Sequence, residues 1–101
     1  MGRLYAGVDG GGTRTRAVVA TVTAAGIAPV GRGASGPANA STTPLPRVVE
    51  AISEAVDDAL EAAGAPREDL AALSCGVAGV EGSGSADRLV AAFSAVYPGA
   101  A

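Results

Sequence analysis

The chain has 101 residues, enough for one small domain at most, and 49% of it is hydrophobic, with much alanine and few aromatic residues. A net charge of −3 with scattered signs argues against a nucleic-acid partner, and no apolar run is long enough to span a membrane. The lack of histidine excludes a His-based triad or metal site, while the lone Cys75 and the absence of a recognisable signal peptide predict a cytoplasmic protein.

The first predicted element is a short apolar strand over residues 4–9, and the next is a strand over residues 13–23 that is rich in Val and Thr. Three consecutive glycines join them: Gly10, Gly11 and Gly12. Because glycine permits positive φ and a close approach of ligand to main chain, consecutive N–H groups of this turn can form a concave nest for phosphate. A plain hairpin needs only one glycine, so three favour phosphate binding over a turn that serves geometry alone.

The side chains beside the glycines suit the same chemistry. Thr13 adds a hydroxyl donor, and Asp9 offers a carboxylate to a phosphate-bound Mg²⁺, with a turn-stabilising role as the alternative for Asp9. Two commoner phosphate motifs do not fit. A P-loop requires lysine, which the chain lacks, and the dinucleotide fingerprint requires a third glycine, where Thr15 stands, and a following helix. The pattern therefore predicts a phosphate loop between two antiparallel strands.

A third strand is predicted over residues 27–32, followed by a small-residue loop over residues 34–43 of the kind that carries ligands. Thr43 is expected to cap a helix with Pro44 at its first position, and Gly64 to end it. Apolar residues at three- and four-residue spacing predict its buried face: Leu45, Val48, Val49, Ile52, Val56, Leu60 and Ala63. Acidic residues are expected on its solvated face: Glu50, Glu54, Asp57, Asp58 and Glu61.

An apolar run over residues 70–77 predicts a strand covered on both faces, in which Cys75 is an inert thiol. A glycine-rich loop follows, and then a second helix that Ser85 caps and that ends at residues 97–99. Its predicted buried stripe consists of Leu89, Val90, Phe93 and Val96. In the order β-β-β-α-β-α, a right-handed crossover lays the fourth strand beside the first, so that the loop after it lies next to the glycine turn.

Three segments together resemble the actin-like ATPase and sugar kinase superfamily, above all its N-acetylglucosamine kinase branch, which is grouped with the BadF/BadG/BcrA/BcrD-type ATPases. DGGGTRT at residues 9–15 resembles the first phosphate motif, GPAN at residues 36–39 the substrate loop, and LSCGVAGVEG at residues 73–82 the fourth strand with its glycine-rich loop. The resemblance implies an α/β, ribonuclease H-like half-domain with a mixed sheet of order 3-2-1-4. It also implies that residues 1–101 are an incomplete N-terminal ATPase domain, truncated before a fifth strand, with the second domain absent.

By the same resemblance, ATP and Mg²⁺ are the expected cofactors, and an N-acetylglucosamine-like sugar is the expected substrate. The implied phosphate-binding residues are Asp9, Gly10, Gly11, Gly12 and Thr13, with Asp9 also orienting the metal. Asn39 and Gly79 are the implied substrate contacts, with an ordinary loop role as the alternative for Asn39. No catalytic residue is expected within the chain, because the family's catalytic Asp ends the fifth strand. The isolated chain is therefore expected to be inactive.

Three functions stay open at this point. The first is the N-terminal part of an ATP-dependent sugar kinase. The second is a BadF-type activator ATPase, which couples ATP hydrolysis to electron transfer through an iron–sulfur cluster and needs cysteines for that cluster. The third is a non-catalytic, truncated interaction domain. Neither a nucleic acid nor a membrane is an expected partner, a homodimer is left open, and these residues do not specify the sugar.

Overall fold

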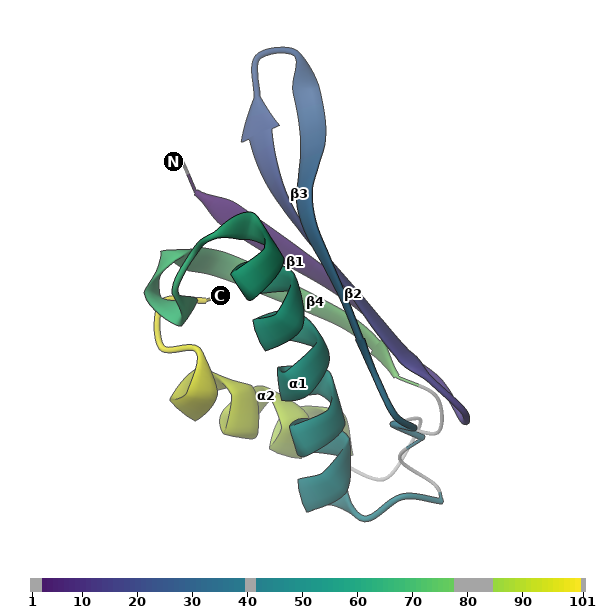
Figure 1. Cartoon of the computed structure of the whole chain (residues 1–101). Coiled ribbons are helices and arrows are strands. Elements are labelled where there is room, and N and C mark those ends of the chain that lie inside the picture. Colours follow the sequence, from purple (N-terminus) through teal and green to yellow (C-terminus); the bar gives the residue numbers. More distant parts are fainter. Residues whose placement is uncertain (1–2, 40–41, 78–84, 101) are drawn as a thin grey trace.

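A computed structural model describes residues 3–39, 42–77 and 85–100, which form a four-stranded sheet with two α-helices against one of its faces (Figure 1). In chain order the elements are β1 (Leu4–Gly10), β2 (Thr15–Thr23), β3 (Gly26–Ser35), α1 (Leu45–Ala63), the 3₁₀-helix η1 (Arg67–Asp69), β4 (Leu70–Val77) and α2 (Ser85–Val96). The sheet order is β3-β2-β1-β4, with β4 parallel to β1 and the other neighbours antiparallel. This confirms the predicted α/β architecture and mixed sheet order. None of the described helices is both long and apolar enough to cross a membrane.

At the open end of the β2–β3 hairpin, β2 begins later and β3 ends later than the sequence predicted. β2 begins at Thr15 rather than at residue 13, because the N–H of Gly11 donates to the carbonyl of Arg14 (2.9 Å) and closes the turn before the strand. β3 continues to Ser35, three residues past its predicted end, because it stays paired with β2 as far as Thr15. The far end of this hairpin projects beyond the helices (Figure 1).

Helix α1 begins without the predicted side-chain cap. Pro44 is the residue that precedes it and no side chain caps it, while the N–H of Thr43 donates to the carbonyl of Asn39 (2.8 Å) in the preceding loop. Thr43 is therefore part of the loop rather than the start of the helix. The other end is as predicted: Gly64 adopts the left-handed conformation (φ 71°), which glycine reaches without a Cβ clash, and its N–H donates to a carbonyl of the last turn.

Helix α1 packs directly on β3 because the residues between them are small. A β-carbon on Gly33 would lie less than 3.0 Å from the carbonyl oxygen of Ala55. A β-carbon on Gly31 would lie equally close to the carbonyl oxygen of Ala59. With Ala51, these alanines recur every four residues and form one ridge along the helix, and all three are buried. The predicted apolar face contained the large residues of this helix but not the alanine ridge.

The hydrophobic core lies between the sheet and the two helices. Its members come from every strand but β3 and from both helices, and they include Leu4, Val8, Val19, Val48, Ile52, Val56, Leu60, Leu70, Phe93 and Tyr97. No described element covers the opposite face of the sheet, the open face, on which Gly7, Asp9 and Arg16 are exposed. The prediction that β4 is covered on both faces is therefore wrong. Ser74 and Gly76 are exposed, because α1 and α2 pack on the same side.

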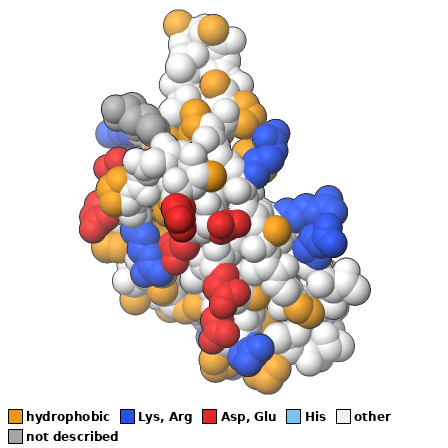
Figure 2. Space-filling model, viewed as in Figure 1, with side chains coloured by type: hydrophobic (Ala, Val, Ile, Leu, Met, Phe, Trp, Pro, Cys, Tyr) orange, Lys and Arg blue, Asp and Glu red, His pale blue; other side chains and the backbone are white. Residues whose placement is uncertain are grey.

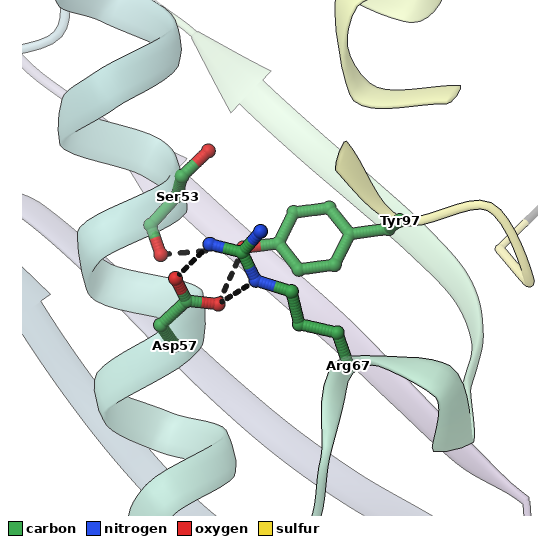
Figure 3. A network of polar contacts seen from close by, with 4 residues as sticks. All are labelled: Ser53, Asp57, Arg67 and Tyr97. Carbon is green, nitrogen blue, oxygen red and sulfur yellow. Dashed lines mark hydrogen bonds and ion pairs between the residues drawn. The ribbon is translucent and has the colours of Figure 1, made fainter. Parts of the chain in front are cut away.

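A polar network fixes the chain after α2 to the middle of α1 (Figure 3). The ring of Tyr97 is fully buried, and its hydroxyl lies 3.0 Å from a carboxylate oxygen of Asp57 and 3.2 Å from the carbonyl oxygen of Ser53. Arg67 donates from Nε to the same carboxylate (2.9 Å) and lies over the tyrosine ring, 5.3 Å from its centroid. Burial, and then the charge of Asp57, raise the pKa of Tyr97 above its ordinary value. Asp57, predicted on the solvated face, is thus a structural anchor.

The predicted buried stripe of helix α2 is confirmed at Leu89 and Phe93 and, partly buried, at Val96, but it is wrong at Val90. Leu89, Phe93 and Tyr97 recur every four residues and are buried, whereas Val90 is 67% exposed, contrary to prediction. Because adjacent helical residues are about 100° apart around the axis, Val90 turns away when Leu89 faces the core. Tyr97 also belongs to this buried stripe, although we predicted it as part of the segment that ends the helix.

Candidate functional site

The glycine turn lies at the end of the sheet where β4 also ends. Gly10 is the last residue of β1 and pairs with Thr15 of β2 on one side and with Val77 of β4 on the other. Val77, the last described residue of β4, therefore lies beside the turn, as the predicted crossover required. Gly79, the predicted substrate contact in that segment, lies outside the described residues.

The glycines of this turn do not adopt positive φ, contrary to the prediction. Among the described residues, positive φ occurs at Gly26 and Gly64 only. A nest built from alternating right- and left-handed residues is therefore not the geometry of this turn.

Gly10 and Gly11 are required by packing instead. A β-carbon on Gly10 would lie 3.2 Å from that of Ala38, and one on Gly11 would lie 3.2 Å from the carbonyl oxygen of Arg14. Both spaces are tighter than ordinary van der Waals contact. Gly10 is also buried, so its contribution to the turn is to let the next loop come close.

Gly12 and Thr13 form the solvent-exposed side of the turn. Both are exposed, and a β-carbon on Gly12 would meet nothing nearer than the side-chain nitrogen of Asn39, at 4.0 Å. No acceptor among the described residues takes the N–H groups of Gly12 and Thr13. Two adjacent N–H groups and the Thr13 hydroxyl are thus available to an anion, which is the part of the phosphate prediction that the geometry supports.

The loop at residues 36–39 is fastened onto the glycine turn by two hydrogen bonds. The N–H of Ala38 donates to the carbonyl of Gly11 (2.9 Å), and the buried hydroxyl of Thr15 donates to the carbonyl of Gly36 (2.7 Å). Asn39, which ends this loop, comes next to Gly12. Two motifs that the sequence identified separately therefore form one surface. The signal that sequence analysis missed is Thr15, a threonine fully buried at the start of a strand.

Asp9 is exposed on the open face at the end of β1, directly across from Arg16 of β2. In the described part of the chain no group of three or more potential metal ligands occurs. One carboxylate next to a candidate phosphate-binding turn nevertheless fits Mg²⁺, because this ion takes most of its ligands from nucleotide phosphates and water when it binds with a nucleotide. The donor set at Asp9 is thus compatible with a phosphate-bound Mg²⁺ and not with a site made of protein ligands alone.

Cys75 lies on β4 near this end of the sheet and does not add a nucleophile. The side chain is half-buried, and burial raises the pKa of its thiol to about 11. Since the thiolate is the reactive form, such a thiol is nearly inert at neutral pH. This agrees with the predicted inert role.

The comparisons with known proteins can now be set beside this geometry. Residues 6–93 match the BadF/BadG/BcrA/BcrD ATPase family. No curated protein matches the chain in sequence. Among solved structures, the chain is similar to a Chromobacterium violaceum protein provisionally named N-acetylglucosamine kinase, with a TM-score of 0.71 and 26% identity, covering 89% of this chain and 31% of that one.

Two reactivating proteins have the same fold. One is a diol dehydratase-reactivating factor, with a TM-score of 0.61 and 26% identity, and the other a glycerol dehydratase reactivase, with a TM-score of 0.61 and 20% identity. Each similarity covers 72% of this chain and 12% of the other protein. The chain thus spans about a third of the length of the kinase structure and a smaller part of the reactivating proteins. Because the family match extends over most of its residues, this chain belongs to the BadF/BadG/BcrA/BcrD ATPase family.

Proposed function

We propose that the chain is the N-terminal part of an ATP-dependent sugar kinase, which transfers the γ-phosphate of ATP to a hydroxyl of an N-acetylglucosamine-like sugar. The observation that carries this proposal is the hydrogen bond from Ala38 to Gly11 (2.9 Å), which joins the candidate sugar loop to the candidate phosphate turn. Phosphoryl transfer depends mainly on holding donor and acceptor together in the correct orientation. The family match and the similarity to the provisionally named kinase support the same function.

In this proposal the exposed side of the turn binds the phosphates. The N–H groups of Gly12 and Thr13 and the Thr13 hydroxyl donate to phosphate oxygens, while Gly10 and Gly11 hold the turn against its neighbours. Asp9 orients Mg²⁺ through water, and the ion when bound neutralises phosphate charge.

The amide of Asn39 can both donate to and accept from sugar hydroxyls beside the phosphates. Gly79, outside the described residues, is proposed as a further contact. The group that orients the attacking hydroxyl is not assigned to any residue of the chain, so residues 1–101 alone are expected to bind without turnover. No observation on the described residues favours the activator ATPase over the kinase.

Gly12→Val tests the phosphate turn. The added side chain meets no protein atom closely but occupies the space in front of two free N–H groups, so the variant should fold normally and bind ATP–Mg²⁺ at least about tenfold more weakly. Gly7→Val is the matched control, because Gly7 is exposed on β1 with nothing within 4 Å of its would-be β-carbon. Titration calorimetry and thermal melting measure both effects. Equal ATP affinity in the two folded variants would refute the assignment.

A further inference from the structure

A hollow of about 370 Å³ lies at the β3 edge of the sheet, and three arginines line it. We call it the arginine hollow and define it by Arg14, Arg16 and Arg32, with Asp58 of α1 as its acidic member. Its remaining lining residues are small or aliphatic. In the space-filling view, basic side chains project from the right-hand side of the molecule, apart from the acidic side chains that gather over α1 (Figure 2).

Strand register brings the arginines together. Arg16 pairs with Ala34 and Val18 pairs with Arg32 in the β2–β3 ladder, so Arg16 and Arg32 are diagonal neighbours on the open face. Diagonal neighbours are about 7–8 Å apart, within reach of long side chains. Like charges placed this close repel each other, and this repulsion is relieved when an anion lies between them.

The positive charge of the arginine hollow is only partly balanced, by Asp58 in its lining and by Asp9, which lies across from Arg16 on β1. In the described part of the chain, ion pairs within 4.0 Å occur at Arg47 and Arg67, and none involves an arginine of the hollow. The carboxylate of Asp58 accepts a hydrogen bond from the N–H of Ala34 (3.4 Å) and so is directed at the edge of β3. Three arginines and one carboxylate thus line the hollow, and the second nearby carboxylate, that of Asp9, lies across from Arg16, in a chain whose net charge is −3.

We propose that the arginine hollow binds a small, multiply charged phosphate compound. Guanidinium groups form paired hydrogen bonds with phosphate oxygens, and two or three of them around one hollow suit a ligand with several negative charges. The volume is that of a small-molecule site. The hollow adjoins the proposed nucleotide site, because the carbonyl of Arg14 accepts a hydrogen bond within the glycine turn and Arg16 lies across from Asp9. Arg32 is its remote member, three residues, or about 10 Å, along β3 from the pair that adjoins the turn. None of the three arginines is among the residues assigned to the proposed kinase site.

Inorganic tripolyphosphate is a suitable probe, with its binding measured by titration calorimetry. Arg32→Gln should weaken binding at least about fivefold, since it removes one guanidinium from the arginine hollow. Arg47→Gln is the matched control: it removes the same charge from an exposed arginine of α1 that forms an ion pair with Glu50 at 4.0 Å, and it should change the affinity less than about twofold. Arg32→Lys keeps the charge but not the forked geometry, and an intermediate loss is expected.

The glycine turn is the competing site for the same probe, and Gly12→Val separates the two. Retention of tripolyphosphate binding by Gly12→Val, together with its loss in Arg32→Gln, would support the arginine hollow. The opposite pattern would assign the binding to the turn and overturn the proposal. Equal losses of affinity in Arg32→Gln and Arg47→Gln would show that only the net charge of the protein matters, and this would overturn the proposal. The absence of measurable binding to the unaltered protein would overturn it too. Thermal melting verifies that each variant is folded. If Arg32→Gln does not fold, Arg32→Lys takes its place in the test.

Discussion

Asn39 shapes its loop through its main chain, and in the proposed function its side chain contacts the sugar; one substitution can separate the two. Its backbone carbonyl accepts hydrogen bonds from the N–H groups of Thr42 and Thr43 (3.2 and 2.8 Å), so the main chain already shapes the loop, and its side chain lies next to Gly12. Asn39→Ala removes the amide and keeps the carbonyl. We expect the dissociation constant for N-acetylglucosamine to rise about two- to tenfold, as for the loss of one neutral hydrogen bond, with little change for ATP–Mg²⁺. Titration calorimetry with each ligand in turn measures this, and equal losses for ATP and sugar would show that the side chain organises the loop instead.

The thiol of Cys75 links stability to pH in a defined direction. Burial raises its pKa in the folded protein to about 11, whereas an unfolded thiol titrates near about 8.5. The folded state therefore favours the protonated form, and the resulting stabilisation is complete below the unfolded pKa and is lost as pH rises towards 11. Urea unfolding should give a free energy of unfolding that decreases between about pH 9 and pH 10. In Cys75→Ala this decrease should be smaller, because what remains comes from Tyr97, whose raised pKa acts in the same direction but at higher pH. An unchanged slope in Cys75→Ala would contradict the assignment.

At the scale of elements, the contact between α1 and β3 depends on residues without a β-carbon on the strand. Gly33→Ala would place a methyl group less than 3.0 Å from the backbone of α1 at Ala55, where no side-chain rotation can relieve it. The helix must move away from the sheet, so we expect a loss of about 1–3 kcal/mol in the free energy of unfolding, typical of overpacking. Gly7→Ala, with nothing within 4 Å, is the control and should stay within about 0.5 kcal/mol. Equal stability of the two variants would mean that α1 does not pack closely on β3.

The same contact shows what a sequence pattern can and cannot predict about an element. Large apolar residues such as Ile52 and Leu60 correctly predicted the buried face of α1, because they recur with the period of an α-helix. The alanine ridge beginning at Ala51 carried no such information, since alanine is common both in cores and on helix surfaces. Tyr97 and Asp57 were missed for a related reason: their hydrogen bond joins residues 40 positions apart, and neither residue type is normally buried alone.

At the scale of the molecule, the order of strands and the position of the glycine turn followed from general rules of chain topology, and the structure agrees with both. The motif residues of the candidate site were predictable because glycines beside Asp and Thr are locally distinctive. Their mutual placement was not, because it depends on hydrogen bonds from residue 38 to 11 and from residue 15 to 36. The expected positive φ was wrong because a glycine can be required by a close neighbour as well as by its own dihedral angles.

The two edges of the sheet differ in how they resist pairing with another strand. β3 carries Pro29 and the charged Arg32 and has α1 packed against it, all of which discourage a further strand. β4, with the sequence LAALSCGV, carries neither proline nor charge, and no described strand pairs with its outer side. We therefore expect the 101-residue chain to self-associate through β4 as its concentration rises, and to melt below about 60 °C because an alanine-rich core of this size stabilises it only modestly.

Ser74→Lys tests this expectation, because Ser74 is exposed on β4 and a lysine there would charge the free edge. Light scattering after size-exclusion chromatography should show larger species for the unaltered chain and a monomer for Ser74→Lys. Ala24→Lys adds the same charge at the exposed β2–β3 turn and should behave like the unaltered chain, which separates edge pairing from a general effect of charge. A chain that stays monomeric at every concentration, or one whose association is equally reduced by both lysines, would show that the β4 edge is not the contact.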